Sequence, residues 1–394
     1  MVVRPPNIRP ASGLDLGESI ARNAPPVPDP PLQTLLPAGA TCGPLTAYQP
    51  GGARPLAAVA IPARDETAHI AGCLEALRCQ WSPQTGRLED RFAVVVVVNG
   101  TSDATAYEVV RWARAHPRFP LLAVDVRFAD GDAHVGSARR YALALAGDLL
   151  GDDPRGLLFS TDADSRLRHH AVARALAESA RVDAFGAHIV TDGPDPSRVG
   201  RLFNRHRALR AALRHRLFPE PHERSAPHGV FGGAGFGVRL GAYRAIGGLP
   251  PLPYDEDQAL RAALRCGGFA VSYPSDVVVT TSTRLAGRVP WGMARQLSAW
   301  AADEAAGRWP LAPSGSALRY RYRRKATMRA AHAAASDPEP FELVWRRWWE
   351  SPAIARAVAA LFPPLPLPAA IRSLERALEH VEPVAASPVA AEVA

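Results

Sequence analysis

The chain has 394 residues, 47% hydrophobic and 21% charged, with 46 basic and 38 acidic side chains. No run of about 18 apolar residues occurs, which argues against a membrane-spanning helix, and no signal peptide opens the chain, so we expect a cytoplasmic protein. Four scattered cysteines argue against a disulfide framework or a structural zinc site. The net charge of +8 suits an anionic partner such as a nucleotide, a phosphate or an anionic membrane surface.

The first half of the chain alternates between strand and helix patterns. Residues 1–54 are rich in Pro and Gly and predict a flexible arm. Short apolar runs then predict strands at residues 56–61, 92–98, 121–126 and 157–160, and periodic stretches between them predict helices. This alternation predicts an α/β fold with a mostly parallel central sheet flanked by helices. The turn after the first strand lacks a G-x-G-x-x-G sequence, which argues against a nicotinamide or flavin enzyme.

The fourth strand runs directly into Asp162-Ala163-Asp164. Ligands of open α/β sheets bind beyond the carboxyl ends of the strands, and Mg²⁺ is commonly shared between one or two carboxylates and substrate phosphates. The pattern is therefore one that a metal–diphosphate site would use. An N-terminal cap of the next helix is the simpler alternative, because Asp is also a favoured capping residue.

Further along, residues 184–190 predict a strand and residues 196–217 a basic helix with a solvated face. A glycine-dense segment follows at 229–237, where a ligand or another segment could approach the backbone. Asp255, Glu256 and Asp257 begin a helix, in which helix capping is again the simpler explanation. Strand patterns return at 269–273 and 277–281.

After residue 285 the chain is basic and mainly helical. Basic residues at 321–325 and a Trp-Arg-Arg-Trp-Trp run at 345–349 suit either an interfacial helix at an anionic membrane or ordinary packing and solvation. A peripheral contact with the inner face of the membrane, or with a lipid-linked acceptor, is therefore one interpretation of this region. We expect no nucleic-acid partner.

Six motifs in order resemble those of the family-2 glycosyltransferases of the GT-A fold. They are V-A-I-P-A-R-D-E at 59–66, V-V-N-G-T-S-D at 97–103, H-V-G-S-A-R-R at 134–140, D-A-D at 162–164, the segment from Gly233 to the Gly-Gly at 247–248, and E-D-x-x-L at 256–260. The resemblance covers residues 55–285 and implies a GT-A domain there. It also implies a single-displacement, inverting transfer of a sugar from a nucleotide-diphosphate donor to a hydroxyl acceptor.

The resemblance assigns roles to individual residues. Asp164 and Asp162 would hold a divalent cation, Mn²⁺ or Mg²⁺, and Asp257, with Glu256 as a second candidate, would be the catalytic base. Gly233, Ala234 and Gly235 would lie on the acceptor side. The residues implied in nucleotide binding are Pro62, Ala63, Arg64, Asp65, Glu66, Asn99, Asp103, Arg139 and Asp162. Arg140 would join Arg139 in neutralising phosphate, since guanidinium groups pair with phosphate oxygens.

Two departures from the family pattern limit what it implies. Val98 stands where many members carry an Asp that recognises uracil, so the donor nucleotide, UDP or GDP, is left open. The processive Q-x-x-R-W motif reads Gln296-Leu297-Ser298-Ala299-Trp300 here, which favours the addition of a single sugar. The acceptor is not identified.

Several alternatives stay open at this stage. A retaining GT-A transferase of the glucosyl-3-phosphoglycerate synthase type would share this layout, as would a non-catalytic nucleotide-sugar-binding protein. A nucleotidyltransferase is disfavoured because its glycine-rich opening loop is missing. A glycosidase with paired carboxylates is disfavoured because its chemistry needs no metal-binding pair at a strand end.

Overall fold

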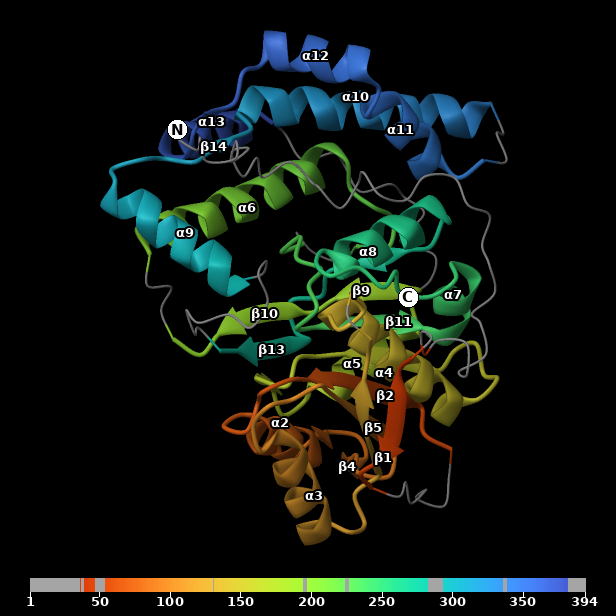
Figure 1. The fold of residues 1–394 in the computed structure, drawn as a ribbon. Helices are drawn as coiled ribbons and strands as arrows, with labels where there is room; N and C mark the ends of the chain where they lie inside the picture. The colour runs from red at the N-terminus through yellow and green to blue at the C-terminus, as the bar shows by residue number, and fades with distance from the viewer. Residues whose placement is uncertain are drawn as a thin grey trace. The chain divides into compact units, whose positions relative to one another are not determined.

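The computed structural model describes residues 36, 39–46, 54–129, 131–193, 197–223, 227–282, 293–335 and 339–381 (Figure 1). The chain divides into two compact units. We call the first the sheet unit, which comprises the described residues up to 193 together with 227–282. The second, the helical unit, comprises residues 197–223, 293–335 and 339–381.

An eight-stranded sheet forms the centre of the sheet unit, in the order β1-β6-β5-β2-β7-β11-β9-β12. The four strands β6, β5, β2 and β7 pair in parallel, β11 runs antiparallel to β7 and β9, and β1 runs antiparallel to β6. The predicted α/β fold with a mostly parallel central sheet is confirmed. The strand bounds are β1 Thr41–Pro44, β2 Ala57–Ala63, β5 Phe92–Asn99, β6 Leu121–Arg127, β7 Leu157–Ser160, β9 Ala184–Gly186, β11 Phe236–Arg239 and β12 Val271–Ser272.

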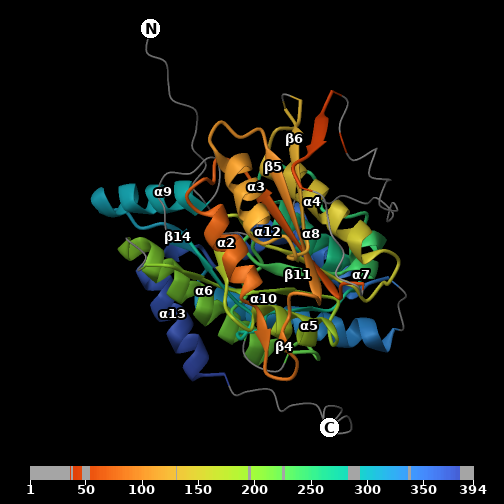
Figure 2. The same cartoon turned by 90° about the horizontal axis from the view of Figure 1, so that it is seen from below.

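Helices cover both faces of this sheet and bury an apolar core on each. Side chains of α2, α3 and α5 contribute to one core and those of α4, α7 and α8 to the other. Figure 2 shows α2 and α3 on one side of β5 and α4 on the other. All eight residues of β5 are buried, which explains why its valine run is apolar on both faces. The helix bounds are α2 Ile70–Arg78, α3 Thr105–Ala115, α4 Val135–Leu150, α5 Ala171–Ser179, α7 Leu240–Ala245 and α8 Glu256–Cys266.

The sheet unit also contains a smaller three-stranded sheet, one strand of which directly follows Asp164 in the sequence. It consists of β10 (His188–Thr191), β13 (Val278–Thr281) and β8 (Ser165–Leu167), with β10 parallel and β8 antiparallel to β13. Because β8 starts directly after Asp164, its pairing with β13 fixes the backbone at that carboxylate. A short hairpin of β3 (Trp81–Ser82) and β4 (Gly86–Arg87) completes the strands of this unit.

The helical unit is built from six helices and one short ribbon among its described residues. Apolar side chains of α6, α10 and α13 form a common core, which includes Leu213, Leu318 and Leu374. The bounds are α6 Arg198–Leu217, α9 Met293–Ala305, α10 Gly315–Ala334, α11 Phe341–Trp349, α12 Pro352–Leu361 and α13 Leu367–Glu379, with β14 Leu311–Ala312 paired to β15 Leu365–Pro366.

The tryptophans of α11 face the basic side chains of α10. The Arg321 guanidinium lies 5.1 Å from the Trp349 ring centroid, and the Arg324 guanidinium lies 5.3 Å from that of Trp348. Lys325 lies over Trp345, which is itself buried, and forms an ion pair with Glu342. These clusters therefore stabilise the packing of α10 on α11 through cation–π contacts. No helix within the described residues is long and apolar enough to cross a bilayer.

Three expectations differ from the structure. Residues 41–44, within the predicted arm, form β1 and pair with β6, while most of residues 1–54 lie outside the described residues. The predicted strand at 184–190 is two strands, because β9 joins the central sheet and β10 the smaller one. Helix α6, placed by sequence in the 55–285 domain with a solvated face, groups with the C-terminal helices because it buries Leu213 and Leu217 against them.

Candidate active site

Asp162 and Asp164 follow the carboxyl end of β7. The Thr161 N–H donates to the carbonyl of Ala60 and so extends the pairing with β2 to the last residue before the carboxylates. The Asp162 side chain is 37% exposed. Oδ1 of Asp164 lies 3.4 Å from the Ser165 hydroxyl and 3.5 Å from that of Thr281, on the smaller sheet. Both carboxylates therefore occupy the edge at which α/β proteins bind ligands.

Arg139, on the first turn of α4, connects Asp162 to the helix that carries the predicted base. Its side chain is 3% exposed. Nη2 donates to Asp162 Oδ1 at 2.7 Å, Nε donates to Glu256 Oε1 at 3.0 Å, and Nη1 donates to the Ser160 hydroxyl at 2.6 Å and the Gly233 carbonyl at 2.8 Å. All three guanidinium nitrogens are thus bonded within the protein. Arg139 positions the two carboxylates, and the direct phosphate contact expected from sequence stays a prediction.

Asp257 lies in the first turn of α8, next to Glu256. Its Oδ2 accepts from the Gly233 N–H at 2.7 Å and its Oδ1 accepts from the Gln258 N–H at 2.6 Å. Burial, with the neighbouring Glu256 charge acting in the same direction, raises the pKa of Asp257 to about 7. Such a carboxylate can exchange a proton near neutral pH.

The glycine-dense segment brings its backbone close to Arg139 and Asp257. The Gly233 peptide groups bond both residues, since its N–H donates to Asp257 and its C=O accepts from Arg139. A Cβ at position 233 would lie 2.6 Å from Arg139 Nη2, so a side chain there would displace the guanidinium or the segment. The next carbonyl, that of Ala234, accepts from the Thr161 hydroxyl at 2.8 Å. Gly233 and Asp162 therefore belong to one hydrogen-bonded network centred on Arg139, and Ala234 is bonded to the residue that precedes Asp162.

Asp65 and Asp103 join the loops that follow β2 and β5. Asp65 Oδ1 accepts from the Ser102 N–H and from the Thr101 and Ser102 hydroxyls, and hydrogen bonding from Ser102 lowers the pKa of Asp65. Asp103 accepts from the N–H groups of Thr67 and Thr105. Burial acts to raise the pKa of Asp103, but these bonds and those from hydroxyls outweigh it and hold the pKa well below its usual range. Both side chains thus hold the loops together at the predicted nucleoside pocket.

The other residues expected to bind the nucleotide lie at the ends of the same strands. Pro62 and Ala63 close β2, and Glu66 is buried in the loop beyond it. Arg64 reaches the Ala133 carbonyl at 3.3 Å. Asn99 ends β5 and is 3% exposed, and its Oδ1 has no hydrogen-bond partner within the described residues. Since buried acceptors are normally satisfied, Asn99 is the residue in this group with a carbonyl oxygen available to a ligand.

Arg140 is not directed at the carboxylates. Its Nη1 donates to the carbonyls of Gly247 and Leu249, at 3.1 and 2.5 Å. These bonds hold the Gly-Gly turn after α7 against α4. Nη1 of Arg140 is therefore engaged in holding this turn, and the phosphate contact expected of Arg140 stays a prediction.

Two residues contact the site that sequence reasoning did not single out. The buried Cys73 thiol, on α2, donates to the Asp162 carbonyl at 3.6 Å. Burial raises the pKa of the Cys73 thiol well above its usual range, and the charges of Asp164 and Asp162 act in the same direction. Ser160, also buried, binds Arg139. A serine at the end of an apolar strand is only a weak sequence indication of a site residue. A cysteine within the apolar stripe of a helix gives no such indication.

The donor set suits a divalent cation that is completed by its substrate. No cluster of three or more His, Cys, Asp or Glu ligands occurs among the described residues. Asp162 and Asp164 provide oxygen donors of the kind that Mg²⁺ and Mn²⁺ prefer, and Mg²⁺ sites commonly combine one or two carboxylates with substrate phosphates. The residues present therefore fit a cation that binds together with a diphosphate.

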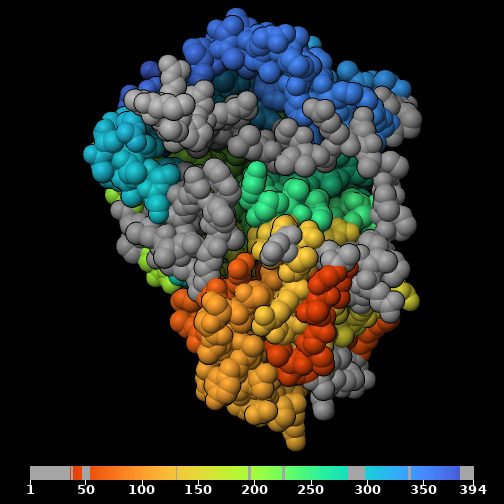
Figure 3. Space-filling model, in the orientation of Figure 1, coloured from red at the N-terminus to blue at the C-terminus, as the bar shows by residue number. Residues whose placement is uncertain are grey.

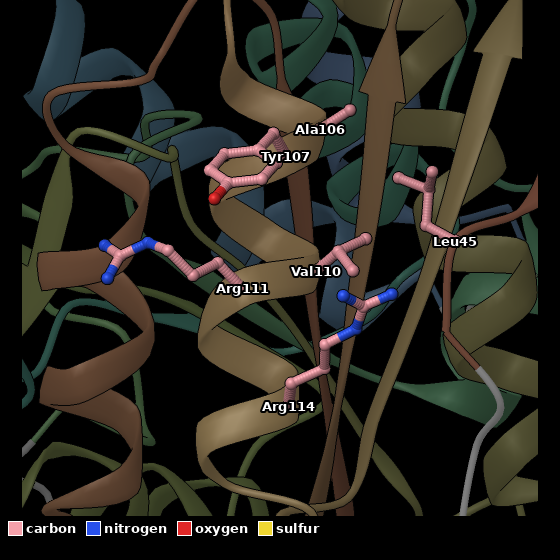
Figure 4. Close-up of a pocket in the computed structure, with 6 residues that line it drawn as sticks. All are labelled: Leu45, Ala106, Tyr107, Val110, Arg111 and Arg114. Atoms are coloured by element: carbon pink, nitrogen blue, oxygen red, sulfur yellow. The ribbon is translucent and has the colours of Figure 1, made fainter.

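A cavity of about 390 Å³ lies elsewhere, on the outer side of α3. Tyr107, Arg111 and Arg114 of that helix line it, with Leu45 across from them (Figure 4). None of the predicted site residues contributes to this cavity, so it is separate from the carboxylate site.

Comparison with known proteins gives similarity at the level of the fold. No protein-family model and no curated protein matches the chain. A structure of the mannosyltransferase PcManGT from Pyrobaculum calidifontis in complex with GDP-Man and Mn²⁺ aligns with a TM-score of 0.46 and 21% identity, over 88% of this chain and 81% of that one. S. aureus TarS 1-349 in complex with UDP-GlcNAc gives 0.43 and 17%, over 61% of this chain and 64% of TarS. At these values the likeness concerns the fold, and the function has to be argued from the chain's own residues.

Proposed function

We propose that this protein is a metal-dependent glycosyltransferase that moves a single sugar from a nucleotide-diphosphate sugar to a hydroxyl acceptor, with inversion at the anomeric carbon. One observation carries the proposal: Arg139 joins the strand-end carboxylate Asp162 to Glu256 and, through the Gly233 peptide, to Asp257. A group able to hold a cation and diphosphate is thereby fixed relative to a group able to accept a proton. Sugar transfer from an activated donor needs both.

On the donor side, Asp162 and Asp164 would hold the cation, which when bound acts as a Lewis acid on the departing diphosphate. Pro62, Ala63 and Glu66 would line the nucleoside pocket, and the loop bonds of Asp65 and Asp103 would keep its shape. The unsatisfied Asn99 Oδ1 suits a donor group of the base or ribose. The donor would be a UDP or GDP sugar.

On the acceptor side, Asp257 would take the proton of the acceptor hydroxyl while the hydroxyl oxygen attacks the anomeric carbon. The bond from that carbon to the diphosphate oxygen breaks in the same displacement. The two N–H groups that Asp257 binds orient its carboxylate, and its pKa of about 7 suits a base at neutral pH. Glu256, bonded to Arg139, would support this geometry from the neighbouring position.

The test is the turnover of UDP-, GDP-, dTDP- and CDP-sugars with Mn²⁺ present. Turnover is measured as the release of nucleoside diphosphate. Asp257→Asn is expected to lower turnover by about 10²–10⁴-fold, the usual contribution of a general base, while it keeps nucleotide binding. Asp152→Asn, a matched change at a fully exposed carboxylate, is expected to leave turnover unchanged.

Three outcomes would contradict the proposal in different ways. If the wild-type protein binds nucleotides but consumes no donor, it is a binding protein. If Asp257→Asn turns over like the wild type, the base is misassigned. If the product keeps the anomeric configuration of the donor, the transferase is retaining and Asp257 does not activate the acceptor for a single displacement.

A further inference from the structure

Helix α12 is an apolar helix on the surface of the helical unit. None of its ten residues is buried, and Arg356 is its one charged residue. Leu361, at its end, is 68% exposed. The segment that includes α12 lies at the surface in Figure 3. Surface helices normally turn a polar face to water, so this helix has the composition of one that contacts something else.

The apolar surface continues from α12 onto the first half of α10. The Phe362 ring lies 5.4 Å from the ring of Tyr320, which is itself 37% exposed. We call Tyr320, α12 and Phe362 the apolar patch. Clustered exposed apolar groups of this kind commonly mark interaction sites.

The surroundings of the apolar patch are basic. Neither α10 nor α12 contains an acidic residue. Arg323 and Arg324, three and four residues after Tyr320, are its neighbours on the helix surface and are exposed. Arg356 is also exposed, and neither Arg323 nor Arg356 forms an ion pair within the described residues. Lys325 and Arg329 differ, because they pair with Glu342 and Glu220.

We propose that the apolar patch and its basic rim dock onto the surface of an anionic lipid bilayer. A second copy of the chain is disfavoured as the occupant, because a two-fold contact would bring the same arginines together. A nucleic acid would use the arginines but not an apolar helix. An interfacial helix uses both, as its apolar side chains enter the headgroup boundary while nearby arginines attract anionic lipids. With ten residues, α12 is too short to span the bilayer.

This placement differs from the sequence-based interpretation of the same region. That interpretation assigned the membrane contact to the Arg and Trp clusters, whereas Trp345, Trp348 and Trp349 pack under α10 side chains. Apart from Arg324, which is exposed and also contacts Trp348, the surface proposed here consists of residues outside those contacts.

The test is flotation of the full-length protein with vesicles of phosphatidylcholine alone or with 30% phosphatidylglycerol, in about 0.1 M salt, where electrostatic attraction still acts across about 10 Å. We expect binding to the anionic vesicles and a steep loss as salt is raised. Arg323→Gln and Arg356→Gln are each expected to weaken binding about fivefold, the usual effect of one basic residue near a charged membrane. Leu361→Asp is expected to weaken it further.

Matched controls come from equally exposed positions elsewhere. Arg372→Gln and Arg376→Gln remove exposed charges of α13, and Tyr107→Asp adds a charge at a side chain that is 65% exposed. Unchanged circular dichroism and melting of every variant separate docking from folding. The proposal is overturned if the wild type does not bind anionic vesicles, if the controls weaken binding as much as the patch variants, or if the patch variants act only by dissociating a dimer.

Discussion

The Asp257 carboxylate is held by backbone hydrogen bonds and yet has a strongly raised pKa. Two backbone N–H groups bind its oxygens, yet burial and the adjacent Glu256 raise its pKa to about 7. Backbone donors favour the charged form, so the raised pKa shows that burial outweighs them at this position. The same side chain is therefore held in one orientation and is able to exchange a proton.

This raised pKa predicts an acid limb in the activity profile. Below pH 7 Asp257 becomes protonated and cannot accept the acceptor proton, so kcat/KM should fall about tenfold per pH unit. Above pH 7 the carboxylate is charged and the limb should level off. The measurement is kcat/KM for the preferred donor from pH 5 to 9, and a flat profile down to pH 5 would remove Asp257 as the base.

Arg139 should be the most costly single residue of the site to remove. Arg139→Met leaves the Glu256 side chain, 7% exposed, without its charged partner. Breaking one side of a buried pair typically costs about 3–5 kcal/mol of unfolding free energy. Urea unfolding at neutral pH measures this loss.

The double variant Arg139→Met/Glu256→Gln serves as the internal control for that loss. It removes the stranded charge as well and should recover part of the stability. Arg111→Met breaks a surface pair with Glu108 and is expected to lower the unfolding free energy far less than Arg139→Met, because water screens that pair. If Arg111→Met and Arg139→Met lower the unfolding free energy equally, the buried network contributes no more to stability than a surface pair does.

At the scale of single residues, sequence identified the ends of the network but not its centre. Asp162, Glu256 and Asp257 follow from motif and position. Arg139 was assigned to phosphate from the family resemblance and because guanidinium groups pair with phosphate oxygens. Its partners Glu256 and Gly233 lie 117 and 94 residues away along the chain, a pairing that local sequence cannot specify.

The glycine-dense segment links the end of β7 to α8 through hydrogen bonds of its backbone. Gly233→Ala would place a methyl group 2.6 Å from Arg139 Nη2 and force one of them to move. We expect the displaced network to lower turnover by about 10²-fold, the scale associated with a 1 Å misplacement.

Steady-state turnover of Gly233→Ala against Gly43→Ala tests this prediction. A Cβ at Gly43, in β1, meets no atom within 4 Å, so that variant should behave as the wild type. Wild-type turnover in Gly233→Ala would mean that the segment adapts and that its fit to Arg139 has no part in activity.

Elements were predicted best where burial imposes one pattern. The valine run of β5 has a single interpretation because both of its faces are covered. Helix α6 was misassigned because its seven arginines suggest a solvated surface, while Leu213 and Leu217 pack against helices more than 100 residues later. Strand β1 was missed because its residues, Thr41–Pro44, show no apolar alternation and gain their conformation only by pairing with β6.

For the molecule as a whole, cation and nucleotide are expected to bind as a pair. Two carboxylates, one already bonded to Arg139, offer a cation few ligands, so Mn²⁺ alone should change the melting temperature little. With UDP or GDP present at about 100 times its dissociation constant, Mn²⁺ should add up to about 2.7 kcal/mol of unfolding free energy.

Thermal unfolding with and without EDTA measures this linkage. Asp164→Asn should abolish the part that depends on Mn²⁺, and Asp152→Asn should retain it. A stabilisation by nucleotide that EDTA does not alter would contradict the metal-dependent proposal. The sequence predicted a C-terminal region that starts at residue 286, whereas α6 also groups with those later helices, which the linear order of motifs could not specify.

The backbone conformation at Asp255 bears on which sequence variants of this protein a selection would recover. Asp255 precedes α8 with a φ of +56°, a left-handed conformation that costs most non-glycine residues about 1–2 kcal/mol. Glycine at this position would relieve that cost, so a search for heat-tolerant variants is expected to recover Asp255→Gly. Such variants would also free the turn that leads into Glu256 and Asp257. Greater heat tolerance and faster turnover should therefore trade against each other at this residue, two positions before the proposed base.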